Sequence, residues 1–188
     1  MNKKGRIIIL SGPSGAGKTT LHDLLLKSPE FRGRIVRSVS ATTRKPRGTE
    51  KQGREYFFFS KKMFEHKIRT HQFLEWARVF DNYYGTPIKN VREILSRGRH
   101  VLLCIDVQGA RLVRKKVPEA FLVFVKTPSL DELRRRLEKR GTDSKESISL
   151  RLKTARLELK DVSRYDCVIV NDELNRAFGE LKQVLAKI

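Results

Sequence analysis

The sequence predicts an α/β protein in which a parallel sheet is flanked by helices. Short apolar runs alternate with helical patterns along the chain, at residues 6–10, 100–106, 120–126 and 167–171. Runs that are apolar on both faces are typical of parallel strands with helices on both sides. A glycine-rich phosphate-binding motif directly follows the first run. With 188 residues, of which 39% are hydrophobic, the chain is expected to form one domain with a real core.

The core elements follow from local signals. After the first apolar run, a glycine loop leads into a helix expected over about 17–27. Thr86 and Pro87 are interpreted as an N-cap followed by proline at the first helical position. That helix is expected to continue to about Ser96 and to stop near Gly98.

Two stretches depart from the simple alternation. Residues 38–86 are rich in Arg, Gly, Tyr and Phe, with short strand-like runs, and we interpret them as a small mixed lobe inserted into the core. Residues 127–160 read as a helical pair. The first helix begins with a capping box of Ser129 and Glu132 and ends at Gly141. The second carries one apolar stripe, formed by Ile148, Leu152, Ala155 and Leu159.

The phosphate-binding motif is "GPSGAGKT", residues 12–19, which matches G-x-x-x-x-G-K-[ST] in full. Its glycines allow backbone N–H groups to surround a phosphate chain, and the following helix adds its positive dipole end. Lys18 is expected to reach the β- and γ-phosphates, and Thr19 to offer a hydroxyl to Mg²⁺. The residues expected to contact ATP here are Gly12, Pro13, Ser14, Gly15, Ala16, Gly17, Lys18, Thr19 and Thr20.

An acid follows a later strand. "VLLCID" carries Asp106 to the carboxyl end of a predicted strand, where open α/β sheets bind their ligands. This is a Walker B-like arrangement, and Asp106 is therefore a candidate for the metal site. The alternative is that Asp106 only caps the following turn.

The inserted lobe carries candidates for a second anionic ligand. Arg44 and Arg47 bracket a proline that stiffens the turn, so the two guanidiniums are expected to point inward onto one terminal phosphate. Tyr56 and Tyr84 could add phenol donors. Glu75 lies among apolar and aromatic neighbours, where a carboxylate suits a ligand with two adjacent N–H donors, as guanine has and adenine does not.

These motifs, in this order, are where the chain resembles the guanylate kinase family over nearly its whole length. The matching segments are "SGPSGAGKTTL", "SATTRKPRGTEKQGREYFF", "FLEWARVFDNYYGTP", "IDVQGA", "PSLDELRRRLEKRGTDS", "SISLRL" and "YDCVIVNDEL". The resemblance implies the P-loop nucleoside-monophosphate-kinase fold. It also implies transfer of the γ-phosphoryl group of Mg-ATP to GMP or dGMP.

The same resemblance implies an organisation and a set of roles. The core would comprise about 1–37, 87–126 and 161–188, the GMP-binding lobe about 38–86, and a helical lid about 127–160. The GMP site would be formed by Ser40, Arg44, Arg47, Tyr56, Glu75, Tyr84, Thr86 and Asp106. Lys18, Arg44 and the lid arginines Arg136, Arg140 and Arg151 would be catalytic, Asn171 would lie near the adenine of ATP, and Thr19 and Asp106 would serve Mg²⁺.

One position departs from the family pattern. The family usually has a second acid two residues before the position of Asp106, where this chain has Cys104. Residues 104 and 106 of an extended strand point to the same face. The replacement puts the outer shell of the Mg²⁺ site in doubt, and with it the geometry of the metal.

Composition sets limits on the alternatives. The net charge of +20 favours anionic partners, and a basic nucleic-acid-binding protein is one alternative, although no such motif is found and we expect no specific nucleic acid. A guanylate-kinase-like binding module with weak catalysis is another. No stretch reaches the length of a membrane span, so a cytoplasmic protein without a membrane partner is expected, as a monomer or homodimer. Cys104 and Cys167 are expected to be buried free thiols, and the histidines to be structural.

Overall fold

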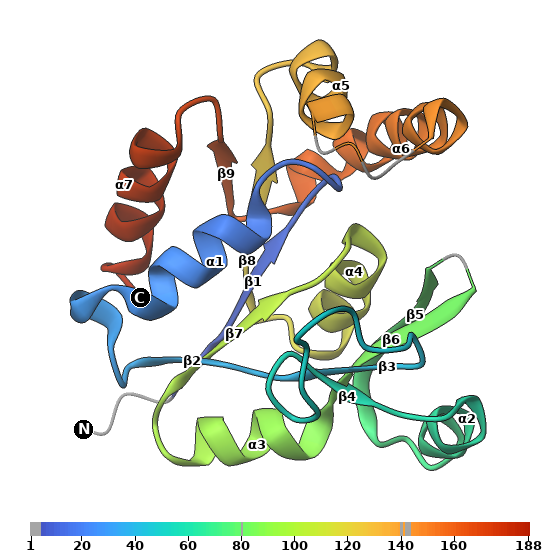
Figure 1. Ribbon diagram of the computed structural model, residues 1–188. Coiled ribbons are helices and arrows are strands. Elements are labelled where there is room, and N and C mark those ends of the chain that lie inside the picture. The colour runs from blue at the N-terminus through green and yellow to red at the C-terminus, as the bar shows by residue number, and fades with distance from the viewer. Residues whose placement is uncertain (1–4, 80, 140, 142–143) are drawn as a thin grey trace. The chain divides into compact units, whose positions relative to one another are not determined.

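The computed structural model describes residues 5–79, 81–139, 141 and 144–188 (Figure 1). The chain falls into two compact units, and each is described by itself. Unit 1 comprises Met1–Ile7, Gly33–Leu103 and Gln108–Ala120, and unit 2 comprises Ile8–Arg32, Cys104–Val107 and Phe121–Ile188.

Both units contain strands and helices. The strands are β1 (Ile7–Ser11), β2 (Ile35–Arg37), β3 (Ser40–Thr42), β4 (Tyr56–Phe58), β5 (Phe73–Val79), β6 (Asn82–Pro87), β7 (His100–Cys104), β8 (Phe121–Lys126) and β9 (Cys167–Val170). The helices are α1 (Lys18–Lys27), α2 (Lys61–Arg69), α3 (Ile88–Ser96), α4 (Val107–Lys116), α5 (Leu130–Lys139), α6 (Lys145–Glu158) and α7 (Leu174–Leu185), with 3-10 turns η1 (Pro29–Phe31) and η2 (Leu159–Arg164).

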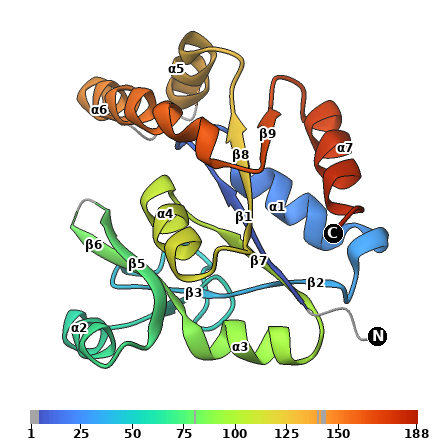
Figure 2. The same ribbon diagram turned by 180° about the vertical axis from the view of Figure 1, so that it is seen from behind.

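The larger sheet has five strands in the order β2-β7-β1-β8-β9, and its pairs β1–β8, β8–β9 and β2–β7 are parallel. All four apolar runs of the sequence are strands of this sheet, so the predicted parallel α/β architecture is confirmed. In unit 2, α1 and α7 lie side by side along β1, β8 and β9 (Figures 1 and 2). Both helices bury small and branched apolar side chains, among them Leu21, Leu25, Ala177 and Leu181. This packing fixes the end of β1, from which the phosphate-binding loop departs.

Unit 1 contains a second sheet, with the order β4-β3-β6-β5. Strand β3 pairs parallel with β4 and antiparallel with β6, so this sheet is mixed. Helix α2 lies against one face of it, where Phe64 packs with Ala41 and Phe73. The rings of Phe64 and Phe73 stack with centroids 4.4 Å apart. The opposite face of this sheet is thereby left for polar side chains.

The helical pair of unit 2 forms its own small core. Helices α5 and α6 pack through Leu133, Leu137, Ile148, Leu152 and Ala155, which confirms most of the predicted apolar stripe. Leu159 lies beyond α6, at the start of η2, and is half-buried. The Ser129 hydroxyl accepts from the backbone N–H of Glu132 at 3.1 Å, so this half of the predicted capping box is present. The Glu132 carboxylate accepts instead from the guanidiniums of Arg135 and Arg136.

Some local predictions were wrong. Thr86 is not an N-cap: it belongs to β6, and α3 begins at Ile88 after Pro87 without a side-chain cap. The physical reason is that Thr86 pairs with Glu75 across β5 and β6, and its side chain turns to the Glu75 carboxylate, to which its hydroxyl donates, instead of to the first turn of α3. Cys104 and Cys167 are not joined in a disulfide, as expected, but they are half-buried rather than fully buried. Among the helices that the structure describes, none has the length and apolarity that a membrane crossing requires.

Candidate functional site

The phosphate-binding loop of unit 2 is folded around its own lysine. The Lys18 ammonium donates to the carbonyl oxygens of Gly12 at 2.6 Å and Pro13 at 2.8 Å. Helix α1 begins at Lys18 itself. The first N–H groups of the helix, which have no acceptor within the helix, therefore lie next to the amides of the loop. The predicted strand–loop–helix context of the motif is therefore present.

The loop is held by elements that are remote in sequence. Asn171, which follows β9 and is 4% exposed, donates from its side-chain amide to the carbonyl of Ala16 at 2.8 Å. Gly17 has φ = 92° and lies so close that a Cβ atom would overlap the Asn171 amide. A Cβ atom at Gly12, where φ is 130°, would overlap the carbonyl oxygen of Val125 in β8. These glycines are needed for close approach as well as for the turn.

Of the arginines predicted for a lid, the structure describes two, and only one of them, Arg151, forms a hydrogen bond with the phosphate-binding loop. Arg151 in α6 donates from Nη1 to the Ser14 hydroxyl at 2.7 Å. Arg136 in α5 donates to Glu132 at 2.7 Å and to the carbonyl of Asp172 at 3.2 Å. Arg140, the third arginine predicted for the lid, lies outside the described residues.

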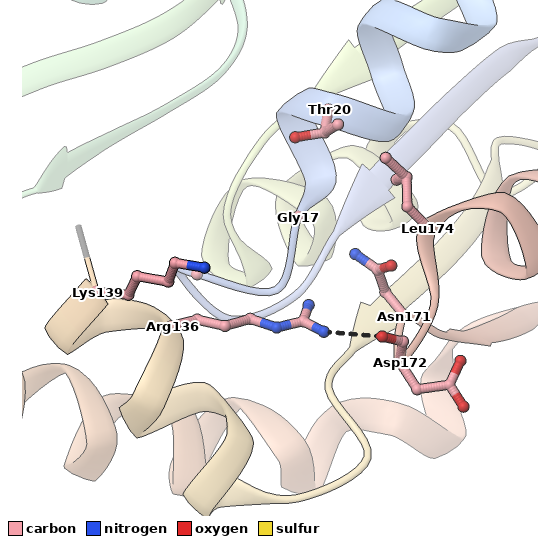
Figure 3. A pocket seen from close by; sticks show the side chains of 8 residues that line it. Gly17, Thr20, Arg136, Lys139, Asn171, Asp172 and Leu174 are labelled. Carbon is pink, nitrogen blue, oxygen red and sulfur yellow. Dashed lines mark hydrogen bonds between the residues drawn. The ribbon is translucent and has the colours of Figure 1, made fainter.

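A cavity of about 370 Å³ opens beside the loop (Figure 3). In Figure 3, Arg136 and Lys139 approach from α5, while Asn171, Asp172 and Leu174 lie on the opposite side of it. The lining also includes Gly15, Gly17 and Thr20 of the predicted ATP site. A pocket next to the N-terminus of α1 with two cationic side chains at its rim suits a nucleotide polyphosphate. Asn171 lines it while its amide is engaged with the loop, so it serves the loop as well as the pocket.

Acids gather near the loop lysine in unit 2. Burial raises the pKa of the Glu158 carboxyl at the end of α6, Lys18 opposes this, and the negative charges of Asp106 and Asp161 add to it. Asp106 follows β7 and directly precedes α4, as predicted. Sequence analysis missed Glu158, because nothing in the local helical pattern distinguishes it from a solvated acid.

The two residues predicted for a metal site, Thr19 and Asp106, offer only oxygen donors. Thr19 lies in the first turn of α1, is exposed, and carries a hydroxyl group. Asp106 carries a carboxyl group and is half-buried. Within the described part of the chain, no group of three or more His, Cys, Asp or Glu side chains could by itself hold a metal ion. Hard oxygen ligands in small number fit Mg²⁺, which usually keeps waters and shares its coordination with substrate phosphates.

In unit 1, the predicted acceptor residues share one face of the mixed sheet. In the strand register, Ser40 lies opposite Tyr56, Glu75 opposite Thr86, and β3 runs antiparallel to β6. Paired residues point to the same face, and residues two apart on a strand do as well, which adds Tyr84. Helix α2 covers the other face. Five residues predicted from scattered segments thus meet on one surface.

A bulge in β5 makes this arrangement possible. The register shifts between Phe73, which pairs with Pro87, and Glu75, which pairs with Thr86. Without the extra residue, Phe73 and Glu75 would point to the same face. The bulge allows Phe73 to pack under α2 while Glu75 takes the open face.

Glu75 and Thr86 form a buried polar pair. The Thr86 hydroxyl donates to Oε1 of Glu75 at 2.6 Å, with Glu75 4% and Thr86 0% exposed. An ionised carboxylate only accepts hydrogen bonds, so a ligand that contacts Glu75 from the open face has to bring donors such as N–H groups to it. This is the chemistry that guanine's N1–H and 2-amino group supply.

Arg44 lies at the other end of the same surface. Its guanidinium carbon is 5.5 Å from the centroid of the Tyr56 ring, and the Tyr56 and Tyr84 rings meet edge to face at 6.1 Å. The Glu50 carboxylate accepts from Arg44 at 3.0 Å and raises the pKa of the guanidinium. Glu50 was not predicted as a site residue, although it is the one acid among the basic residues of 44–54.

Not every predicted contact is present. Arg47 is exposed, and its hydrogen bonds to Glu50 are made by its backbone N–H and C=O, not by its guanidinium. Asp106, predicted for the same guanine pocket, belongs to unit 2, whereas Glu75 and Thr86 belong to unit 1. The roles of both residues therefore remain predictions.

Comparisons with known proteins agree with one another. A family model described as guanylate kinase matches residues 4–188. The guanylate kinase of Rubrobacter xylanophilus is 47% identical over 186 residues, covering 99% of this chain and 96% of that protein. The guanylate kinase of Fusobacterium nucleatum is 48% identical over 181 residues, covering 96% of each. The crystal structure of guanylate kinase from Anaplasma phagocytophilum gives a TM-score of 0.79 at 33% identity, covering 98% of this chain and 86% of that one.

Proposed function

This chain belongs to the guanylate kinase family, and we propose that it transfers the γ-phosphoryl group of ATP to GMP or dGMP, giving ADP and GDP or dGDP. The observation that carries the proposal is the shared sheet face of unit 1. It presents the buried Glu75–Thr86 pair, suited to guanine, and the Arg44–Tyr56–Tyr84 group, suited to a monophosphate. The phosphate-binding loop of unit 2 supplies the donor side.

On the donor side, the polyphosphate of ATP enters the ring of loop amides. Lys18 then exchanges its internal carbonyl partners for phosphate oxygens, which are stronger, charged acceptors. The cavity beside Gly17 and Asn171 receives the rest of the nucleotide. Arg136 and Arg151 reach the transferring group; the same role is implied for Arg140 by the family resemblance alone.

The metal ion would be Mg²⁺, held by Thr19 and Asp106 with the phosphates of ATP. When bound, it neutralises charge on the β- and γ-phosphates. Cys104 ends β7 two residues before Asp106, and a thiol is a poor ligand for this ion. Asp106 therefore carries the protein's acidic contribution to the site.

The transfer itself needs positioning and charge neutralisation more than covalent chemistry. An oxygen of the GMP phosphate is already a nucleophile, so the chain's residues only have to align it with the γ-phosphorus. Arg44 and Arg47 offset the repulsion between the two anions. An arginine that stabilises the transferring group is worth roughly 10³–10⁵ in rate, which is the contribution assigned to the lid arginines.

Closure would exclude water from the reaction. We assign residues 38–86 to the acceptor lobe and 127–160 to the lid, with the remaining residues as the core. The acceptor lobe and the lid each have a hydrophobic cluster of their own, one around Phe64 and one around Leu133. Separate clusters are expected of segments that move as rigid bodies. The surplus of cations attracts both anionic substrates without requiring a nucleic-acid partner.

One assay tests the proposal. ADP formation from Mg-ATP is measured with GMP, dGMP, IMP, AMP, CMP and UMP as acceptors, and without any acceptor. We expect rapid turnover with GMP and dGMP and little with the others, because only guanine offers both N–H groups to Glu75. Equal turnover across the panel, or ADP formation that does not depend on an acceptor, would contradict it.

A further inference from the structure

Glu50 places a carboxylate inside the group of cations assigned to the acceptor phosphate. Its Oε1 accepts from Nη2 of Arg44 at 3.0 Å, and its Oε2 accepts from the backbone N–H of Arg47 at 2.8 Å. The side chains of Arg44 and Glu50 are only 12% and 22% exposed. One carboxylate therefore links the two arginines assigned to the GMP phosphate.

The carboxylate is fixed by the chain around it. The backbone N–H of Glu50 donates to the carbonyl of Arg47 at 3.0 Å. In return, the Glu50 carboxylate accepts a hydrogen bond from the backbone N–H of Arg47. Both main-chain groups of Arg47 are thus bound to Glu50, and the turn over 47–50 is closed from both ends. Moving the carboxylate away would release a backbone donor as well as Arg44.

Arg44 is held on several sides as a result. Nη1 donates to the carbonyl of Lys45 at 2.7 Å, and the guanidinium lies over the Tyr56 ring. Its backbone N–H donates to the buried hydroxyl of Thr42 at 3.1 Å. A guanidinium has five N–H donors, so donors remain for a phosphate after these contacts. The side-chain entropy that an arginine usually loses on binding has already been lost.

We propose that Glu50 is a positioning residue for the acceptor phosphate, one that holds Arg44 in its receiving orientation before GMP binds. This inference rests on the proposed function. Two effects of Glu50 oppose each other: its charge repels the incoming phosphate, while its hydrogen bonds pre-organise Arg44. Because the carboxylate is anchored to the main chain and engages only one edge of the guanidinium, pre-organisation is the larger effect.

The test compares Glu50→Gln with a matched control. The control is Glu55, five residues further along the chain. Its carboxylate also accepts from a backbone N–H, that of Lys51 at 2.6 Å, and from an arginine, but this arginine is Arg54, at 2.5 Å, and not Arg44. Affinities for GMP and for guanosine, which lacks the phosphate, are measured by calorimetry for wild type, Glu50→Gln and Glu55→Gln. We expect Glu50→Gln to weaken GMP binding about tenfold, the size of one charge-assisted hydrogen bond, with guanosine binding, the KM for ATP and Tm unchanged. Glu55→Gln should resemble wild type.

The outcomes separate the possible roles. A GMP affinity equal to wild type overturns the inference, and a tighter one shows that the carboxylate competes with the phosphate. An equal loss of guanosine and GMP would mean that Glu50 only maintains the fold of the lobe. If wild type itself fails to bind GMP, the proposed function falls first, and that result is seen before any variant is compared.

Two further variants keep the test independent of folding and of charge. Glu50→Asp retains the charge, but its shorter side chain cannot span from Arg47 to Arg44, so it should lose GMP affinity as Gln does. Wild-type affinity in Glu50→Asp would show that charge alone matters. In an Arg44→Met background, Glu50→Gln should add nothing, because Glu50 acts through Arg44. Additive losses would contradict that route.

Discussion

The side-chain amide of Asn171 donates to the main-chain carbonyl of Ala16 across 155 residues of sequence, at 2.8 Å. The backbone N–H of Asn171 donates in turn to the carbonyl of Lys126 at 2.7 Å, which ties the residue to the end of β8. The phosphate-binding loop therefore rests on the carboxyl ends of two neighbouring parallel strands, β8 and β9. Its shape depends on residues far outside the motif that identifies it.

Replacing Asn171 should disturb the loop as well as the nucleotide. Asn171→Ala removes a buried hydrogen bond, which is expected to cost about 1–2 kcal/mol of unfolding free energy and to raise the KM for ATP. Inorganic triphosphate, which has no base, should also bind more weakly, because the loop itself has changed. Asn175→Ala, at an exposed position in α7, is the control. Triphosphate affinity equal to wild type, with ATP affinity reduced, would instead assign Asn171 to the adenine alone.

Arg44→Met should affect the acceptor and spare the donor. Loss of a fixed guanidinium from the phosphate site is expected to raise the KM for GMP roughly 10- to 100-fold, with the KM for ATP and the fold retained. Steady-state kinetics with each substrate varied in turn measure the difference. Lys45→Met, its exposed neighbour, should leave both KM values near wild type. Unchanged saturation by GMP in Arg44→Met would remove Arg44 from the site.

Glu75→Gln should abolish the preference for guanine. Thr86 donates to one carboxylate oxygen, so the glutamine would keep its carbonyl oxygen toward Thr86 and turn its NH₂ group toward the N–H groups of guanine. We expect kcat/KM for GMP to fall about 10²-fold or more relative to AMP and IMP, since two donors then face each other. Thr86→Ser keeps the hydroxyl and should preserve the preference. Wild-type discrimination in Glu75→Gln would mean that another residue reads the base.

Tyr165 should make the folded protein sensitive to alkali. Burial raises the pKa of its phenol from an ordinary value of 10.0 to about 12. Between these values the unfolded chain ionises and the folded one does not, so the unfolding equilibrium shifts toward the unfolded state by about a factor of ten per pH unit. Below pH 10 the effect vanishes, because both states are protonated.

The measurement is chemical denaturation between pH 9 and 12 for wild type and Tyr165→Phe. The wild type should lose more stability than the variant over pH 10–12, and tyrosinate absorbance should show one fewer late-titrating phenol in the folded variant. Parallel curves for the two proteins would show that the phenol ionises normally in the folded state.

Much of the fold was accessible from local sequence. The apolar runs of β1, β7 and β8 became strands because burial on both faces requires continuous hydrophobic residues, and the phosphate loop is recognisable because its conformation depends on glycines within a few residues. Thr86 shows where local reasoning failed. Its sequence context is that of a helix cap, but its side chain turns to Glu75, a partner across a strand pair that no short window contains.

By itself, the sequence determined the parallel α/β class, the position of the phosphate loop and the candidates for the acceptor site. Only the tertiary structure decided how those candidates are arranged. The β5 bulge turns Glu75 to the open face, the turn over 47–50 fixes Arg44 through Glu50, and Asn171 supports the loop from the end of β9. The physical reason is that hydrophobic periodicity and glycine conformation act over a few residues. The hydrogen-bond partner of a buried polar group is chosen by proximity in space, which strand register and packing create.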